Sequence, residues 1–228
     1  MKNIARNLLA LALVTTAPLL TSCAATKEIP LSDSSALRGK TLVRVTRKTP
    51  AFSAMTATKM GVGSAFGAIG GAIAAATAVS EGNQIVRENH VEDPAVSMSR
   101  DLATGMSKTY GMKLAGDRHV EATEPADIAK ACSGADYALD ARTINWSLMY
   151  FPGQLRTYRV IYSSQLRLID CRSGQVVAQG FNLRDPQEEE HSYSYDGLVE
   201  NGANNLKKES KIAGNTAKNH FKSSVLKY

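Results

Sequence analysis

The side chains that can carry out acid–base, nucleophilic or metal chemistry are scattered along this chain of 228 residues. No two of its four histidines have the helical spacing or the Cys/His clustering of a metal or proton-transfer site: His90, His119, His191 and His220. No glycine-rich loop that follows a strand ends in Lys-Ser or Lys-Thr, so a phosphate-binding loop is not predicted. We therefore expect no catalytic residue, no metal and no cofactor, and a protein that is not an enzyme.

One cysteine does stand in surroundings that indicate chemistry. A basic start and an apolar run over 8–20 lead into Leu20-Thr21-Ser22-Cys23, which is the pattern of a secretory signal peptide with its cut site. This cut site resembles the lipobox of bacterial lipoproteins. The resemblance implies that residues 1–22 are removed and that Cys23 becomes the first residue of the mature chain. It also implies that Cys23 carries thioether-linked diacylglycerol and an amide-linked acyl chain such as palmitate.

The lipobox also indicates where the protein resides. Several buried acyl chains hold a protein firmly in a bilayer, because each buried methylene contributes about 0.8 kcal/mol. Ala24 follows Cys23, whereas an Asp at this position resembles the inner-membrane retention signal of enteric bacteria. We therefore expect a lipid anchor in the outer membrane, with the protein facing the periplasm and outer-membrane lipid as its first partner.

Composition favours one globular domain. Hydrophobic residues make up 43% of the chain, and the net charge of +6 falls to +4 once Lys2 and Arg6 leave with the signal peptide. This mild charge, together with export, argues against a nucleic-acid binder. We expect a lipidated flexible tether over 23–39 and a single domain over 40–228, with a Gly/Ala-rich insertion at about 58–82.

The remaining cysteines, Cys132 and Cys171, are candidates for a disulfide in an oxidising periplasm. If Tyr150 pairs near Arg156 in the hairpin described below, Cys171 lies opposite about Ala135. That register permits the bond without requiring it, because a slip of one residue would defeat it. The alternative is a pair of buried free thiols.

Residues 60–79 are uncharged and rich in Gly and Ala. Their length meets the requirement of about 20 residues for a membrane-spanning helix, but Ala and Gly transfer weakly into lipid. Gly63, Gly67 and Gly71 recur every four residues, a Gly-zipper-like spacing that lets helices approach closely in membranes or oligomers. Three alternatives stay open: a helix or helical hairpin in or on a membrane, a mobile loop, or a helix buried in the domain or an oligomer.

The rest of the chain alternates between strand and helix patterns. A strand is indicated at 40–49, and a helix at 94–110 with Asp93 as its cap and Gly111 as its stop. One or two helical turns are expected at 125–131 and a long helix at 196–225. Three strands between 137 and 183 form a meander, with a bulge near Thr143 where the apolar parity changes.

Aromatic and Arg residues gather about the first hairpin of this meander. Such residues are enriched at contact surfaces, although they also fill cores. The candidates for partner contact are Trp146, Tyr150, Phe151, Arg156 and Tyr158.

The order of elements predicts an α+β fold: a mostly antiparallel sheet with two main helices on one face. The lipobox, the Gly-rich stretch and the aromatic hairpin together resemble uncharacterised proteobacterial envelope lipoproteins, from which no activity transfers. We favour a non-catalytic, outer-membrane-anchored binding or scaffolding component, with an envelope protein or a second copy as partner. The alternatives are a membrane-inserting secretion or pore subunit that uses 60–79, and an envelope hydrolase.

Overall fold

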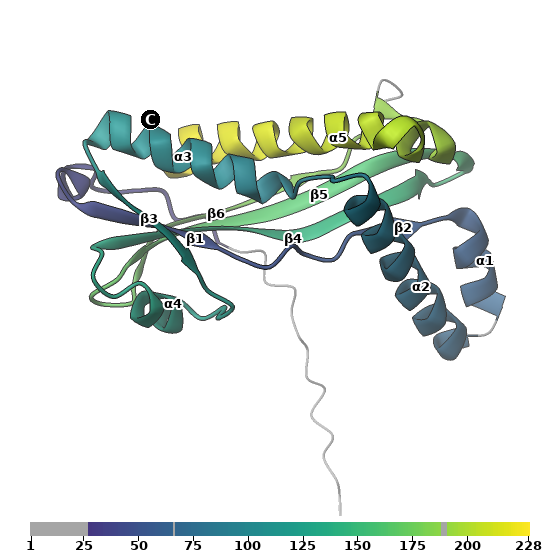
Figure 1. Cartoon of the computed structure of the whole chain (residues 1–228), viewed down its shortest axis with the longest axis horizontal. Coiled ribbons are helices and arrows are strands. Elements are labelled where there is room, and N and C mark those ends of the chain that lie inside the picture. The colour runs from purple at the N-terminus through teal and green to yellow at the C-terminus, as the bar shows by residue number, and fades with distance from the viewer. Residues whose placement is uncertain (1–26, 66, 188–190) are drawn as a thin grey trace, which may run out of the picture.

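The computed structural model describes residues 27–65, 67–187 and 191–228, which are coloured in Figure 1. The signal peptide expected over 1–22 and the lipidation site at Cys23 lie outside these residues. Among the helices so described, none is both long enough and apolar enough to cross a membrane.

Six strands form one mixed sheet in the order β3-β1-β4-β5-β6, and the short β2 also pairs with β4. β1 is parallel to β3 and β4, and β2 is parallel to β4, whereas β4, β5 and β6 form an antiparallel meander. The α+β class, the strand at 40–49 and the meander are thus confirmed. The strands are β1 (Thr41–Thr46), β2 (Ser53–Met55), β3 (Lys113–His119), β4 (Tyr137–Phe151), β5 (Gln154–Asp170) and β6 (Val176–Arg184).

The bulge in β4 lies where the parity of the sequence changes. The register of the β4–β5 ladder shifts between Thr143 and Asn145. The extra residue lets Leu139, before the bulge, and Trp146, after it, reach the same core. Ile144 lies within the bulge and is exposed, although the sequence places it in an apolar alternation with Trp146 and Leu148.

Two helices cover one face of the sheet, as Figure 1 shows: α3 (Pro94–Tyr110) and α5 (Tyr195–His220). The Asp93 side chain accepts a hydrogen bond from the Ala95 amide at the start of α3, and Gly111 ends the helix in the left-handed conformation. Both helices contribute to the main core over the meander. The predicted helix at 94–110 and the two-helix layer are therefore confirmed.

The C-terminal helix is less regular than its sequence predicted. Residues 200–203 leave helical backbone angles and kink α5. A π-helical turn, Phe221–Val225, follows α5 and buries both of its end residues. Pro94 of α3 packs on Gly214, where a Cβ atom would stand 3.1 Å from the Pro94 Cβ. A glycine at this position lets the two helices approach closely.

The opposite face carries a smaller core. The helix α4 (Pro125–Ala131) packs there with Val43, Val45 and Ile169. Cys132 belongs to this cluster and Cys171 packs against it. The helical turns predicted at 125–131 are confirmed.

The Gly/Ala-rich insertion folds as a helical hairpin, α1 (Ala57–Ala65) and α2 (Gly67–Glu88). It projects from one end of the sheet, on the side away from α3 and α5 (Figure 1). A four-residue row of small side chains on α2 is buried, but it is one position earlier than the row we expected. The buried residues are Gly70, Ala74, Ala78, Gly82 and Val86.

The three glycines singled out by their spacing therefore do not form one ridge. Gly63 packs inside the hairpin, where a Cβ atom would stand 3.1 Å from the Ala74 Cβ. Gly67 has a φ of +62° and begins α2, and Gly71 is exposed, with open space at its Cβ position. The turn at Gly67 interrupts the helical spacing that a continuous ridge requires.

Part of the expected tether lies against the domain. Ile29 bridges to Gln179 of β6, and Leu31 and Leu37 are buried. The Leu31 amide donates to the Val225 carbonyl at 2.7 Å. The described chain is therefore fixed to the sheet from Ile29 onward.

Candidate functional site

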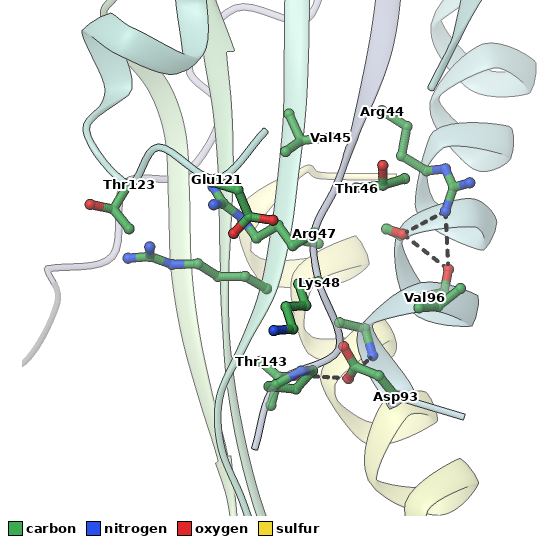
Figure 2. A pocket seen from close by; sticks show the side chains of 15 residues that line it. Arg44, Val45, Thr46, Arg47, Lys48, Asp93, Val96, Glu121, Thr123 and Thr143 are labelled. Carbon is green, nitrogen blue, oxygen red and sulfur yellow. Dashed lines mark hydrogen bonds between the residues drawn. The ribbon is translucent and has the colours of Figure 1, made fainter. Parts of the chain in front are cut away.

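A basic cleft of about 280 Å³ lies where the sheet has a gap. β1 pairs with β4 at 137–139 and β2 pairs with it at 147–149, so the stretch of β4 between them pairs only with β5. The link from β1 to β2 passes beside this gap, and the start of α3 closes it (Figure 2). The charged side chains that line the cleft are Arg44, Arg47, Lys48, Asp93, Glu121 and Arg142.

Asp93 joins the helix layer to the bulge. Its Oδ1 accepts hydrogen bonds from the Ala95 amide at 3.0 Å and from the Thr143 hydroxyl at 2.5 Å. Burial raises the pKa of this carboxyl above its ordinary value. The side chain is therefore engaged in holding α3 on β4.

Arg44 and Lys48 differ in how far their charges are satisfied. Arg44 forms an ion pair with Asp117 and donates to the Ser99 hydroxyl at 3.1 Å. Lys48 is exposed, and within the described part of the chain it forms no ion pair or hydrogen bond. Glu121, on the facing loop, contacts His119 at 2.7 Å. Lys48 is thus available to a ligand.

A buried ion triad supports the floor of the cleft. Arg47 donates to one oxygen of Asp140 at 2.8 and 2.9 Å, and Arg167 donates to the other at 2.6 and 3.1 Å. Arg47 also donates to the Val120 and Ala122 carbonyls. The Asp140 side chain has no exposed surface. One carboxylate therefore balances two guanidinium groups, which leaves one positive charge.

Arg142 adds a further positive charge beside this triad. It is half-buried, and its only hydrogen-bond acceptor in the described chain is the neutral Gln165 Oε1, at 2.8 and 3.1 Å. Burial, together with repulsion from Arg167, lowers the pKa of the guanidinium below its ordinary value. A half-buried cation without an ion pair is electrostatically suited to an incoming anionic group.

The chemistry available in the cleft is binding rather than bond breaking. Guanidinium groups recognise carboxylate and phosphate through paired N–H donors. Across residues 27–65, 67–187 and 191–228, no group of three or more His, Cys, Asp or Glu could hold a metal ion.

The aromatic residues proposed for partner contact are mostly in the core. Trp146 is 1% exposed and packs edge-on against Phe52, with ring centroids 4.9 Å apart, and Tyr158 is 6% exposed. Their side chains therefore offer almost no surface to a partner.

The tip of the same hairpin is more open. Phe151 is buried under Arg159, whose guanidinium carbon lies 4.4 Å from the centre of the ring. Tyr150 is half-buried, and Arg156 is exposed. Of the five residues, Arg156 alone is freely accessible within the described chain.

The two cysteines come together without bonding. Both are free thiols in the structure, Cys132 buried and Cys171 half-buried. Burial raises the pKa of the Cys171 thiol to about 12, and the nearby Cys132 adds to this shift. The disulfide that the sequence permitted stays a prediction.

No family model matches this chain, and no curated protein matches it. Among solved structures it is similar to a PelC dodecamer from Paraburkholderia phytofirmans, with 12% identity, 83% of this chain and 89% of that chain covered, and a TM-score of 0.30. It is also similar to the hypothetical protein CT253 from Chlamydia trachomatis, with 9% identity, 80% of this chain and 92% of that chain covered, and a TM-score of 0.38. For lipoprotein GNA1162 from Neisseria meningitidis the identity is 12%, the coverage is 78% of this chain and 98% of that chain, and the TM-score is 0.27. At such scores, these likenesses assign neither a family nor an activity to this chain.

The basic cleft was not foreseen from the sequence. Its residues come from four separate segments, and Arg47 lies 93 positions from Asp140. A usable signal was nevertheless present. Asp140, Arg142 and Arg167 stand at alternating positions of two neighbouring strands of the predicted meander, and three charges on one face of a sheet indicate pairing.

Proposed function

We propose that this chain is a non-catalytic, lipid-anchored binding component of the bacterial outer membrane, and that its basic cleft holds an anionic group of an envelope partner. The proposed role of the cleft rests on Arg142, a half-buried cation that forms no ion pair in the described chain. The anchor is inferred from the lipobox that ends at Cys23.

The size of the cleft limits its occupant. Ligand pockets for drug-sized molecules commonly measure about 300–1,000 Å³, and this cleft of about 280 Å³ lies at the lower end. A carboxylate or phosphate group of a larger molecule fits such a space. Arg142 and Lys48 supply the attraction, while the ion triad keeps Arg47 rigid beside them.

Photocrosslinking in intact cells tests the cleft. A photoreactive amino acid at Thr123, an exposed residue that lines the cleft, should capture a partner that mass spectrometry then names. The same group at Leu183, exposed on β6, serves as the control position. Replacing Arg142 by Gln should abolish capture from Thr123, and capture that persists unchanged would contradict the proposal.

Labelling with radioactive palmitate tests the anchor separately. The wild-type chain should incorporate label and sediment with outer membranes, whereas Cys23→Ser should incorporate no label. An unlabelled wild-type chain in the soluble fraction would refute the anchor, although the cleft could still bind its ligand.

A further inference from the structure

The hairpin of α1 and α2 presents an apolar surface at its projecting end. Ile69 is 76% exposed and Ile73 62%, and Met60, nearer the base of the hairpin, is 46% exposed. Ile69, Ile73 and Ala74 line an apolar groove of about 480 Å³ beside α1. Residues 60–80 carry no charged side chain. Exposed apolar surface of this kind marks a contact with lipid or with another protein.

A charged collar marks the base of the hairpin. Lys59 and Glu81 form an ion pair, and the Tyr195 hydroxyl donates to Glu81. Lys59 also donates to the Ala54 carbonyl at 2.8 Å. The collar connects the hairpin to α5 and separates its uncharged end from the domain.

The N-terminal end of the described chain lies on the same side of the sheet as the hairpin. Arg167 and Gln179 are paired neighbours on the face away from α3 and α5, and the Gln179 side chain donates to the Lys27 carbonyl at 3.0 Å. The hairpin projects to that side in Figure 1. Cys23 precedes Lys27 by four positions, so the Cα of Cys23 can lie at most about 14 Å from that of Lys27.

The geometry points to the projecting end of the α1–α2 hairpin as a second membrane contact, which buries Ile69 and Ile73 among the lipids next to the anchor. This inference rests on the lipid anchor of the proposed function, because the short tether is what brings the bilayer to this side of the sheet. The groove beside Ile69 and Ile73 is lined almost entirely by apolar atoms and accommodates an acyl chain.

Lipid suits this surface better than a second copy does. α1 has nine residues, so it is about 14 Å long and reaches into one leaflet of a hydrocarbon core of about 30 Å. Stable protein interfaces bury about 800 Å² on each partner, whereas the exposed large apolar side chains of the hairpin are few: Ile69, Ile73 and Met60. A bilayer sets no such minimum, since binding grows with whatever apolar area is buried.

An environment-sensitive fluorophore at position 69 tests the contact. Ile69→Cys is labelled with a nitrobenzoxadiazole maleimide in the full chain, and Leu114→Cys, on an exposed residue of β3, is the matched control. Both are measured in the acylated protein and in the Cys23→Ser form, with vesicles of phosphatidylethanolamine and phosphatidylglycerol. The label at 69 should brighten, shift to the blue and be quenched by spin-labelled lipid, while the label at 114 should not change.

Partitioning gives a second readout. In the Cys23→Ser form, Ile69→Asp combined with Ile73→Asp should weaken vesicle binding by at least about ten-fold, and Leu114→Asp should leave it unchanged. A label at 69 that stays in water in both forms overturns the inference. So does a response without vesicles that rises with protein concentration, because it would indicate a second copy. A wild-type chain that is not acylated would refute the anchor. The fluorescence of the label at position 69 in the Cys23→Ser form would still show whether the hairpin contacts lipid.

Discussion

Gly82 of α2 lies so close to Phe52 that a Cβ atom on Gly82 would stand 2.1 Å from the Phe52 carbonyl oxygen. The Phe52 amide donates to the Asn83 side chain at 2.9 Å, and the Phe52 ring packs on Trp146 in the main core. The base of the hairpin is thus seated on the domain through backbone contact, while its other end is free.

Replacing Gly82 by Ala should therefore destabilise the protein. Ala favours the helix by about 1 kcal/mol, but the clash is with backbone that cannot move aside, and overpacking of this kind typically costs about 1–3 kcal/mol. The control is Gly71→Ala on the same helix, which meets open space and should stabilise by up to about 1 kcal/mol. Denaturant unfolding measures both. Equal stability of the two variants would mean that α2 does not seat on Phe52.

Neutralising Asp140 of the ion triad should lower the stability of the fold far more than neutralising Arg142. Asp140→Asn leaves the half-buried Arg47 and the buried Arg167 without a counter-charge, and breaking a buried pair in this way costs about 3–5 kcal/mol. Arg142→Gln removes a charge that has no ion pair, together with its hydrogen bonds to Gln165, and should cost at most about 1 kcal/mol. Thermal and denaturant unfolding of both variants measure the difference, and a large loss for Arg142→Gln would assign that residue a structural role.

Asp93 should make stability depend on pH. In the folded state the pKa of the Asp93 carboxyl lies above its ordinary value of 3.8. At pH values between the unfolded-state pKa and the folded-state pKa, the folded state binds more protons than the unfolded state, so stability falls as pH rises. Asn caps a helix as well as Asp and still accepts from Thr143. Relative to the wild type, Asp93→Asn should therefore gain stability as pH rises from 3 to 7. A constant difference across this range would contradict the raised pKa.

Local signals in the sequence predicted most of the fold. The caps Asp93 and Gly111 determine both ends of α3, and the parity change near Thr143 predicted the bulge. These features depend on residues a few positions apart, whose physical effects are visible in the sequence itself. The α1–α2 hairpin was one of several alternatives, because Gly and Ala form a helix only where packing supports it.

Features set by pairing between distant segments were predicted less well. We expected Tyr150 to pair near Arg156, whereas it pairs with Tyr158, since the register shifts again after Tyr150. Cys171 consequently donates its amide to the Asp136 carbonyl rather than lying opposite Ala135. The basic cleft depends on the gap between β1 and β2, and nothing in the local pattern of either strand specifies that gap.

Cys171 should be a slow nucleophile. With the pKa of its thiol near 12, raised by burial and by the neighbouring Cys132, the thiolate fraction at pH 8 is about a thousand-fold below that of an ordinary cysteine. Alkylation by iodoacetamide, followed by peptide mapping of the Cys23→Ser chain, should therefore be slow at pH 8 and rise about ten-fold per pH unit. Cys132→Ser removes the repulsive neighbour and should speed the reaction at Cys171. In denaturant without reductant, both cysteines of the Cys23→Ser chain should react at the ordinary rate. If neither reacts until a reductant is added, a disulfide joins them in the cell, and the free thiols of the structure are the reduced form.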